Sequence, residues 1–83
     1  MIKIQYTFDE ICDYLLETCR KLMENDELDR NDDFFSMGGN SVVAVGLLEA
    51  IYSRYHVELQ IYDIVGSPTI EEWADLIMDQ LEK

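Results

Sequence analysis

The loop-to-helix stretch of this sequence reads Phe34-Phe-Ser-Met-Gly-Gly-Asn-Ser-Val-Val-Ala-Val-Gly-Leu-Leu48. It contains no charged residue, although 29% of the chain is charged and about four charges are expected in fifteen residues. Its apolar side chains explain part of this gap, but four small or polar residues do not belong in a core: Gly38, Gly39, Asn40 and Ser41. Adjacent glycines permit backbone dihedrals that other residues avoid, and they let another surface approach closely. Because they lead into the N-terminus of an expected helix, the sequence predicts a local site for an anionic group at Ser41.

An apolar helix is expected over residues 41–55, capped by Asn40 or Ser41. Residues at helical spacing form its expected inner face: Ala44, Val45, Leu48, Ile51, Tyr52 and Tyr55. The outer side then carries a candidate contact surface for partner proteins, which consists of Val42, Val43 and Gly46 together with Met37 of the preceding loop. The alternative is that both valines are half-buried against the loop or the third helix.

Two capping-box patterns mark the other long helices, because each places a carboxylate three residues after a threonine. Thr7-Phe-Asp-Glu10 begins a helix expected over residues 8–24, with an apolar stripe of Phe8, Ile11, Cys12, Leu15, Cys19, Leu22 and Met23. Thr69-Ile-Glu-Glu72 follows Pro68 and begins a helix expected over residues 70–82, with Ile70, Trp73, Ala74, Ile77 and Leu81 directed inward.

The connections between these helices complete the expected fold. Residues 25–40 form a loop of a length that is uncommon in compact domains and tends to be functional. Its expected anchors to the core are Leu28, Phe34, Phe35 and Met37. A second, extended segment tucks in Val57 and Leu59 before a short helix over residues 61–66. The sequence therefore predicts one all-α domain over residues 1–83, a small four-helix bundle of three long helices and one short helix.

The charge of the chain favours some partners and disfavours others. Lys and Arg total 6 against 18 Asp and Glu, so the net charge is −12 and the chain repels nucleic acid and anionic membrane surfaces. Proteins that present Lys and Arg are better partners. No apolar run reaches about 18 residues and no signal-peptide pattern opens the chain, so a cytoplasmic location is expected.

Other candidate sites in the sequence are weak. Cys12 and Cys19 lie about 10 Å apart along one helix, which indicates two core thiols and excludes a disulfide between them. The acidic run over residues 26–33 does not match a calcium-binding loop. Ser41 as a hydrolytic nucleophile would need His56, the only histidine, which is roughly 20 Å away along the same helix. On local chemistry alone, a plain loop end and helix cap explains Gly38 to Ser41 equally well.

A family resemblance separates these alternatives. The segment Asp33-Phe-Phe-Ser-Met-Gly-Gly-Asn-Ser41, the apolar helix after it and the later Ser67-Pro-Thr-Ile-Glu-Glu resemble the acyl and peptidyl carrier proteins, especially the peptidyl carriers of nonribosomal peptide synthesis. The resemblance covers nearly the whole chain. It implies that Ser41 receives 4′-phosphopantetheine from coenzyme A, within the Gly38-Gly39-Asn40 element. Asn40 stands where His or Asp is usual, Val42 replaces a common Leu, and Trp73 replaces a smaller aliphatic residue.

The resemblance also implies partners and a role. A phosphopantetheinyl transferase with magnesium would attach the arm, an adenylation enzyme or acyl ligase would load it, and condensing, tailoring or releasing enzymes would unload it. The chain itself would be a monomeric, non-catalytic carrier of acyl, aminoacyl or peptidyl thioesters. Met1 lies close to the first capping box and Lys83 closes the last helix, so a free-standing carrier is expected. The alternatives are an acyl carrier of polyketide or fatty-acid type, and an unmodified acidic helical adaptor that is indifferent to Ser41.

Overall fold

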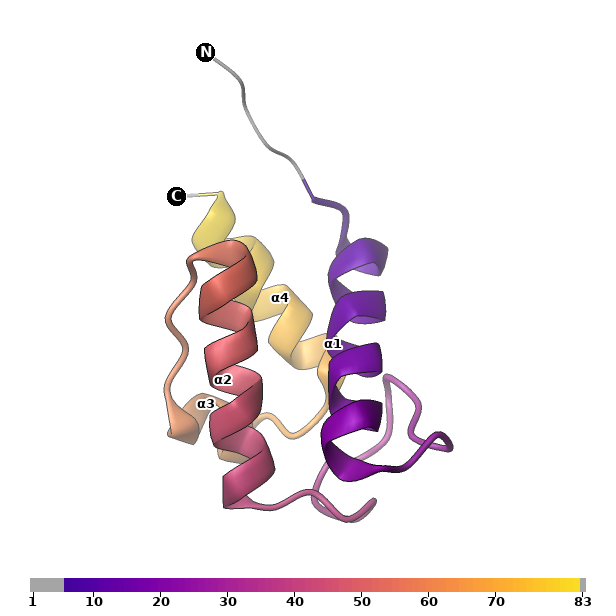
Figure 1. Cartoon of the computed structure of the whole chain (residues 1–83). Coiled ribbons are helices and arrows are strands. Elements are labelled where there is room, and N and C mark those ends of the chain that lie inside the picture. Colours follow the sequence, from indigo (N-terminus) through magenta and orange to yellow (C-terminus); the bar gives the residue numbers. More distant parts are fainter. Residues whose placement is uncertain (1–5, 83) are drawn as a thin grey trace.

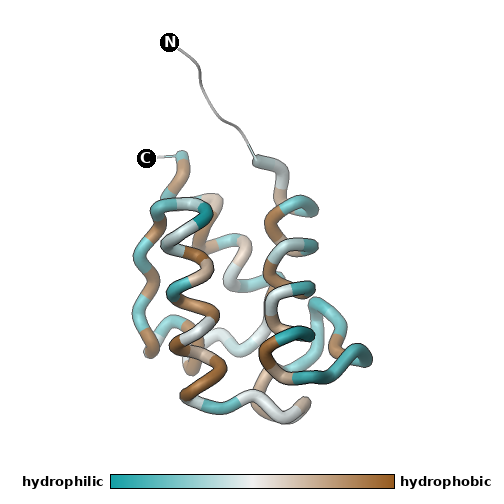
Figure 2. The backbone as a smooth tube through the Cα atoms, in the orientation of Figure 1, coloured by the Kyte–Doolittle hydropathy of each residue, from teal (hydrophilic) through white to brown (hydrophobic). Residues whose placement is uncertain are grey.

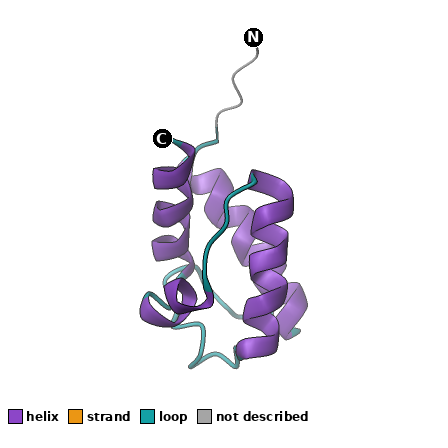
Figure 3. Cartoon of the chain, turned by 90° about the vertical axis from the view of Figure 1, so that its left-hand side faces the viewer, coloured by secondary structure: helices purple, strands orange, loops and turns teal. Residues whose placement is uncertain are grey.

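The computed structural model describes residues 6–82 and contains four helices. These are α1 (Phe8–Met23), α2 (Ser41–Tyr55), α3 (Ile61–Gly66) and α4 (Ile70–Leu81). The three long helices stand side by side, and α3 lies near the N-terminal end of α2 (Figure 1; Figure 3). No strand occurs within residues 6–82, so the predicted all-α, four-helix fold is confirmed. Met1 and Lys83 lie outside the described residues.

Two helix ends differ by one residue from the sequence prediction. The helix predicted over residues 8–24 ends at Met23, because Glu24 adopts left-handed dihedrals (φ 53°, ψ 42°) and its N–H donates to the carbonyls of Arg20 and Lys21. The helix predicted over residues 70–82 ends at Leu81, and Glu82 is its C-cap. At the other end of α1, the Thr7 and Glu10 capping box forms as predicted, with both reciprocal hydrogen bonds present.

The core is built by one face of each long helix together with the long loop. Helix α1 contributes Ile11, Cys12, Leu15 and Cys19, and α4 contributes Ile70, Trp73, Ala74 and Ile77. Leu28 and Phe34 of the loop are buried as predicted, but Phe35 is wrong as an anchor because 38% of its surface is exposed. Leu22 and Leu81, both predicted to point inward, are also exposed, since each lies in the last turn of its helix.

The buried face of α2 is rotated from the predicted one. The structure buries Ala44, Leu47, Ile51 and Tyr55, whereas Val45 and Tyr52 are 50% and 56% exposed. Apolar residues occur around most of this helix, and Figure 2 shows its N-terminal half as mostly hydrophobic. Because the pattern does not single out one face, the packing of α2 against α1 and α3 decides which residues turn inward.

The segment between α2 and α3 is extended and runs alongside α2 (Figure 3). Val57 and Leu59 are buried on its inner side, as predicted. It begins at His56, the C-cap of α2, whose φ of 56° is left-handed and whose N–H donates to the Tyr52 carbonyl at 2.9 Å. Among the helices that the structure describes, none is long and apolar enough to cross a membrane.

Arg30 ties the long loop to two helices. Its Nη1 donates to Asp9 Oδ1 of α1 at 2.9 Å, and its Nε lies 3.2 Å from Glu71 Oε2 of α4. The Glu71 N–H in turn donates to the Arg30 carbonyl at 3.1 Å. Arg20 adds a fourth contact, from its Nε to the Leu28 carbonyl at 2.9 Å. The loop is therefore a fixed part of the fold, and it delivers the chain to the start of α2.

Candidate functional site

Ser41 is the first residue of α2 and is exposed at the end of the bundle where the long loop enters the helix (Figure 1). The cap of the helix is its neighbour Asn40, whose Oδ1 accepts from the Val43 N–H at 3.0 Å. The Asn40 carbonyl accepts from the Ala44 N–H at 2.9 Å. Because Asn40 caps the helix, the Ser41 hydroxyl is not needed for capping and is free for chemistry.

Glycine is required at positions 38 and 39, before Asn40, for two different structural reasons. Gly38 has φ +107°, a conformation that side chains other than hydrogen rarely allow. Gly39 lies against the ring of Phe34, and a Cβ built on it would be 2.5 Å from Cε2 of that ring. Phe34 is fully packed and contacts Trp73 edge to face, with ring centroids 5.2 Å apart. The backbone that presents Ser41 is thus seated directly on a core aromatic ring.

Hydrogen bonds fix the turn that carries these glycines. Asp33 starts it, since its carbonyl accepts from the Met37 N–H and its Oδ1 accepts from the Ser36 N–H at 3.0 Å. The Gly39 N–H donates to the Phe34 carbonyl at 2.9 Å. Asn25, just after α1, donates from Nδ2 to the Met37 carbonyl at 3.1 Å. The approach to Ser41 is therefore held from both the loop and the end of α1.

The N-terminus of α2 is electrostatically suited to an anion. The first turns of α1, α3 and α4 contain acidic residues, whereas among the described helices α2 alone has none in its first turn. The backbone N–H groups of Ser41 and Val42 have no hydrogen-bond partner within residues 6–82. A phosphate on the Ser41 oxygen would meet these N–H groups and the positive end of the helix dipole. The residues present therefore fit a phosphodiester at this position.

The predicted partner-contact residues are not equivalent in the structure. Val42 is 81% exposed and lies beside Ser41, as predicted for an outer-face residue. Val43 is partly buried and packs against the core, as Met37 also does, so for Val43 the half-buried alternative holds in place of the outward position. Gly46 faces α1, where a Cβ would touch Leu22 at 3.4 Å. The structure thus leaves Val42 as the exposed apolar neighbour of the serine.

Other reactive groups lie away from Ser41. His56 caps the opposite end of α2. The length of this helix places His56 roughly 20 Å from the Ser41 hydroxyl. Cys12 and Cys19 are free and buried, and burial raises the pKa of the Cys19 thiol to about 12 and is the main cause of a raised pKa at Cys12. Among the described residues, no group of three or more His, Cys, Asp or Glu side chains is placed to hold a metal ion.

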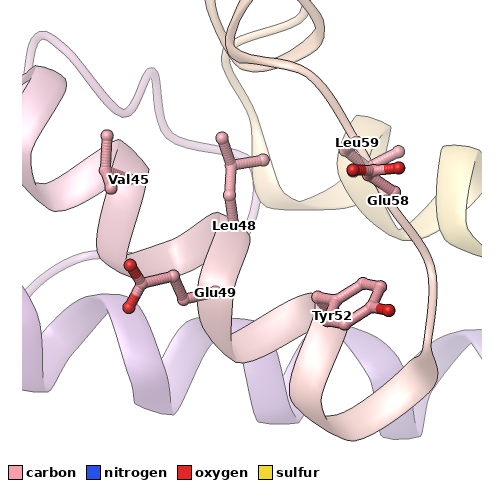
Figure 4. Close-up of a pocket in the computed structure, with 6 residues that line it drawn as sticks. All are labelled: Val45, Leu48, Glu49, Tyr52, Glu58 and Leu59. Carbon is pink, nitrogen blue, oxygen red and sulfur yellow. The ribbon is translucent and has the colours of Figure 1, made fainter.

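The sequence reasoning missed an open groove on the outer side of α2 (Figure 4). Its volume is about 330 Å³, and its lining residues come from α2 and from the extended segment after it: Val45, Leu48, Glu49, Tyr52, Glu58 and Leu59. The signal that could have found it is a helical stripe of three apolar residues at 45, 48 and 52, which the sequence analysis assigned to the core. These residues are instead partly or largely exposed.

Comparison with known proteins gives one family. Residues 9–77 match the family described as "Phosphopantetheine attachment site". Indigoidine synthase from Streptomyces lavendulae is 41% identical over 54 residues, which are 65% of this chain and 4% of that protein. The bassianolide nonribosomal cyclodepsipeptide synthetase of Beauveria bassiana is 38% identical over 65 residues, 76% of this chain and 2% of that protein.

A solved structure supports the fold. A chain in the structure of the phosphopantetheine transferase Sfp in complex with coenzyme A and a peptidyl carrier protein superposes with a TM-score of 0.80, over 95% of this chain and 99% of that one. The sequence identity of that pair is 20%, so the likeness concerns the arrangement of the helices. This chain spans only a few per cent of the length of the curated relatives named above.

Proposed function

The chain belongs to the phosphopantetheine attachment-site family, and from this premise we propose that Ser41 is the residue to which its 4′-phosphopantetheine prosthetic group is joined. The observation that carries the proposal is the position of Ser41, exposed at the acid-free N-terminus of α2 with a neighbour that caps the helix in its place. Gly38, Gly39 and Asn40 shape the backbone around it.

The attachment is a phosphoryl transfer that a separate enzyme performs. The Ser41 oxygen forms a bond to the phosphorus that bears the pantetheine, the pyrophosphate bond of coenzyme A breaks, and the adenosine bisphosphate leaves. The serine proton goes to a base of the transferase, because His56 is too distant to accept it. This chain contributes an accessible hydroxyl and an N-terminal helix dipole that stabilises the added negative charge by about 0.3–1 kcal/mol.

The function is that of a non-catalytic carrier. The thiol at the end of the arm holds an acyl, aminoacyl or peptidyl group as a thioester, and the tether raises the concentration of that group at each enzyme visited. The two thiols of the chain itself are buried with raised pKa values, so they do not compete for the cargo. A cytoplasmic location would keep the arm reduced.

The pathway we propose is nonribosomal peptide synthesis or a related natural-product route. The named relatives that match this chain include a nonribosomal cyclodepsipeptide synthetase and an indigoidine synthase. The implied partners are a phosphopantetheinyl transferase, an adenylation enzyme or acyl ligase that loads the thiol, and condensing, tailoring or releasing enzymes that unload it. Val42, the most exposed apolar residue beside Ser41, is the best candidate for contact with them, with Met37, Val43 and Gly46 around it.

The test is the intact mass of the protein after incubation with coenzyme A, magnesium and a broad-specificity phosphopantetheinyl transferase. Wild type should gain the mass of one phosphopantetheinyl group. It should also acquire one thiol that reacts under native conditions. Ser41→Ala should gain neither, whereas Ser36→Ala, which removes an exposed hydroxyl from the same loop, should behave as wild type. A folded wild type without any mass gain would favour the acidic adaptor, and a gain that survives Ser41→Ala would move the attachment to another residue.

A further inference from the structure

The groove on the outer side of α2 has the size of a site for one small group. Its volume of about 330 Å³ lies at the lower end of the range for small-molecule pockets, roughly 300–1,000 Å³. Leu59 forms its buried side, and Val45 and Tyr52 are exposed along it. The outline of the groove therefore fits a single small ligand group.

The groove lies on the same stripe of α2 as Ser41. Successive residues of an α-helix are about 100° apart, so the fourth, seventh and eleventh residues after Ser41 fall within about 40° of it around the axis. These residues are Val45, Leu48 and Tyr52, three of the groove's lining residues. Figure 4 shows their side chains along one side of the helix, opposite the segment that carries Glu58 and Leu59. A group attached to Ser41 can thus follow the helix directly into the groove.

The prosthetic arm is long enough to reach the groove. Leu48 and Tyr52 lie roughly 10 and 17 Å from Ser41 along the axis at the helical rise. The arm contains two amide units and has about the length of five extended residues, roughly 16 Å. Its thiol end can therefore reach the part of the groove between Leu48 and Tyr52, which brings a group joined to the thiol within reach of both side chains.

The negative charge of the groove favours a positively charged ligand group. Glu49 and Glu58 are both exposed, and neither forms an ion pair with any described residue. None of the six lining residues is basic. An apolar floor with two unpaired carboxylates attracts a group that combines an apolar portion with a positive charge. An aminoacyl thioester has this combination, because its α-ammonium remains free while its carboxyl group is bound to the thiol.

We propose that this groove holds the aminoacyl group carried by the arm, with an apolar side chain against Val45, Leu48 and Tyr52 and the ammonium in the negative field of Glu49 and Glu58, whose carboxylates lie at separate ends of the groove. The proposal rests on the proposed attachment of the arm at Ser41. It names the cargo class as amino acids with apolar side chains. It also gives the carrier a resting state in which the thioester lies against the protein between visits to enzymes.

Nuclear magnetic resonance of the loaded carrier tests this inference. A transferase attaches stable analogues of the arm that end in leucyl, N-acetyl-leucyl or glutamyl groups through an amide in place of the thioester. The leucyl group should shift the backbone amide signals of Val45, Leu48, Tyr52 and Leu59 relative to the bare arm. The N-acetyl-leucyl group, which has no charge, and the glutamyl group, which is acidic, should shift them much less.

Matched charge variants separate the role of the two carboxylates from the effect of net charge. Glu49→Gln with Glu58→Gln should reduce the leucyl-dependent shifts roughly two- to fivefold, the size expected for exposed ion pairs. Glu27→Gln with Asp75→Asn removes the same number of exposed charges away from the groove and should leave the shifts unchanged. All four positions are exposed and their replacements are isosteric, so every variant should fold.

Three outcomes would overturn the inference. The leucyl and bare arms could give the same signals, or the N-acetyl-leucyl arm could give shifts as large as the leucyl arm. The groove variants could also slow loading by an adenylation enzyme without altering the shifts, which would make the groove a docking surface for that enzyme. If no analogue joins the wild type at all, the failure belongs to the proposed attachment at Ser41 and is seen in the mass spectrum.

Discussion

The ring of Phe34 occupies the space into which any side chain on Gly39 would project, with Cε2 only 2.5 Å from the position of a Cβ. Phe34 itself is 1% exposed and is wedged against Trp73. The ring therefore has no free space into which to move. This contact links the hydrophobic core to the backbone two residues before the candidate attachment serine.

Gly39→Ala should destabilise the fold by about 1–3 kcal/mol, because the added methyl group overpacks the core at Phe34. In a domain of this size each kcal/mol lowers the melting temperature by about 4–8 °C. The emission of Trp73, the only tryptophan, follows the unfolding. Gly66→Ala is the matched control, since a Cβ there meets no described atom within 4 Å and it should change stability by less than about 1 kcal/mol. Equal melting temperatures for the two variants would contradict the role of the ring.

Asn40→Ala should cost about 0.5–2 kcal/mol, because the Val43 N–H loses the side-chain oxygen that caps α2. Asn40→Asp keeps an oxygen in the same place and should restore most of the loss. Urea unfolding of the three proteins measures the difference. An equal loss of stability in both variants would mean that the amide nitrogen of Asn40, and not its capping oxygen, stabilises the fold.

Arg30→Ala should lower the stability of the fold measurably, since it removes the contacts to Asp9 and Glu71 that hold the long loop between α1 and α4. Arg30→Lys should recover only part, because an ammonium lacks the planar fork that reaches two carboxylates at once. Lys21→Ala breaks a fully exposed pair with Glu17 and is expected to change stability by less than about 0.5 kcal/mol. Chemical denaturation at low and high salt would show whether Arg30 exceeds this control.

Alkaline pH should destabilise the protein through Cys19. Burial raises the pKa of its thiol from the ordinary 9.0 to about 12 in the folded chain, so between these values the unfolded chain loses a proton that the folded chain keeps. The stabilisation is complete below about pH 9 and falls by about 1.4 kcal/mol per pH unit as the pH rises toward 12. Urea unfolding near pH 8 and pH 10 measures the slope. In Cys19→Ala the slope should be shallower, and an unchanged slope would assign it to other groups.

The fold could be predicted from the sequence where local signals act alone. The patterns at Thr7 and Thr69 located the starts of α1 and α4, because N-terminal caps depend on residues three apart. The capping box at Thr7 is complete. At Thr69 the predicted box is wrong in one bond, because the hydroxyl accepts from the Glu72 N–H but donates to the Glu72 carboxylate, and the Thr69 N–H makes no bond to that carboxylate. The all-α class followed from the same helical patterns and is confirmed. The predicted ends of these helices are each one residue too late. At α1 the left-handed cap is Glu24, where no glycine marks the end of the helix, whereas the cap of α4, Glu82, has right-handed dihedrals.

Only part of the candidate site could be predicted from the sequence. The position of Ser41 at the start of α2 could be predicted, because the glycines and Asn40 precede an apolar run. The groove could not, because α2 is apolar on most sides and only packing against α1 shows that Val45 and Tyr52 remain outside. The contact between Gly39 and Phe34 lies within one turn, but it depends on the burial of the Phe34 ring against Trp73, which no spacing rule predicts.

Because the first turn of α2 contains no acidic residue, the melting temperature should depend on whether the chain carries the phosphate of the arm. Without an anion at this terminus, the apo protein lacks a favourable charge interaction that α1, α3 and α4 supply from their own side chains. The phosphate of the arm would supply it, by about 0.3–1 kcal/mol. The holo protein should therefore melt a few degrees above the apo protein. Thermal scans of the separate apo and holo proteins would then show the modification without a label.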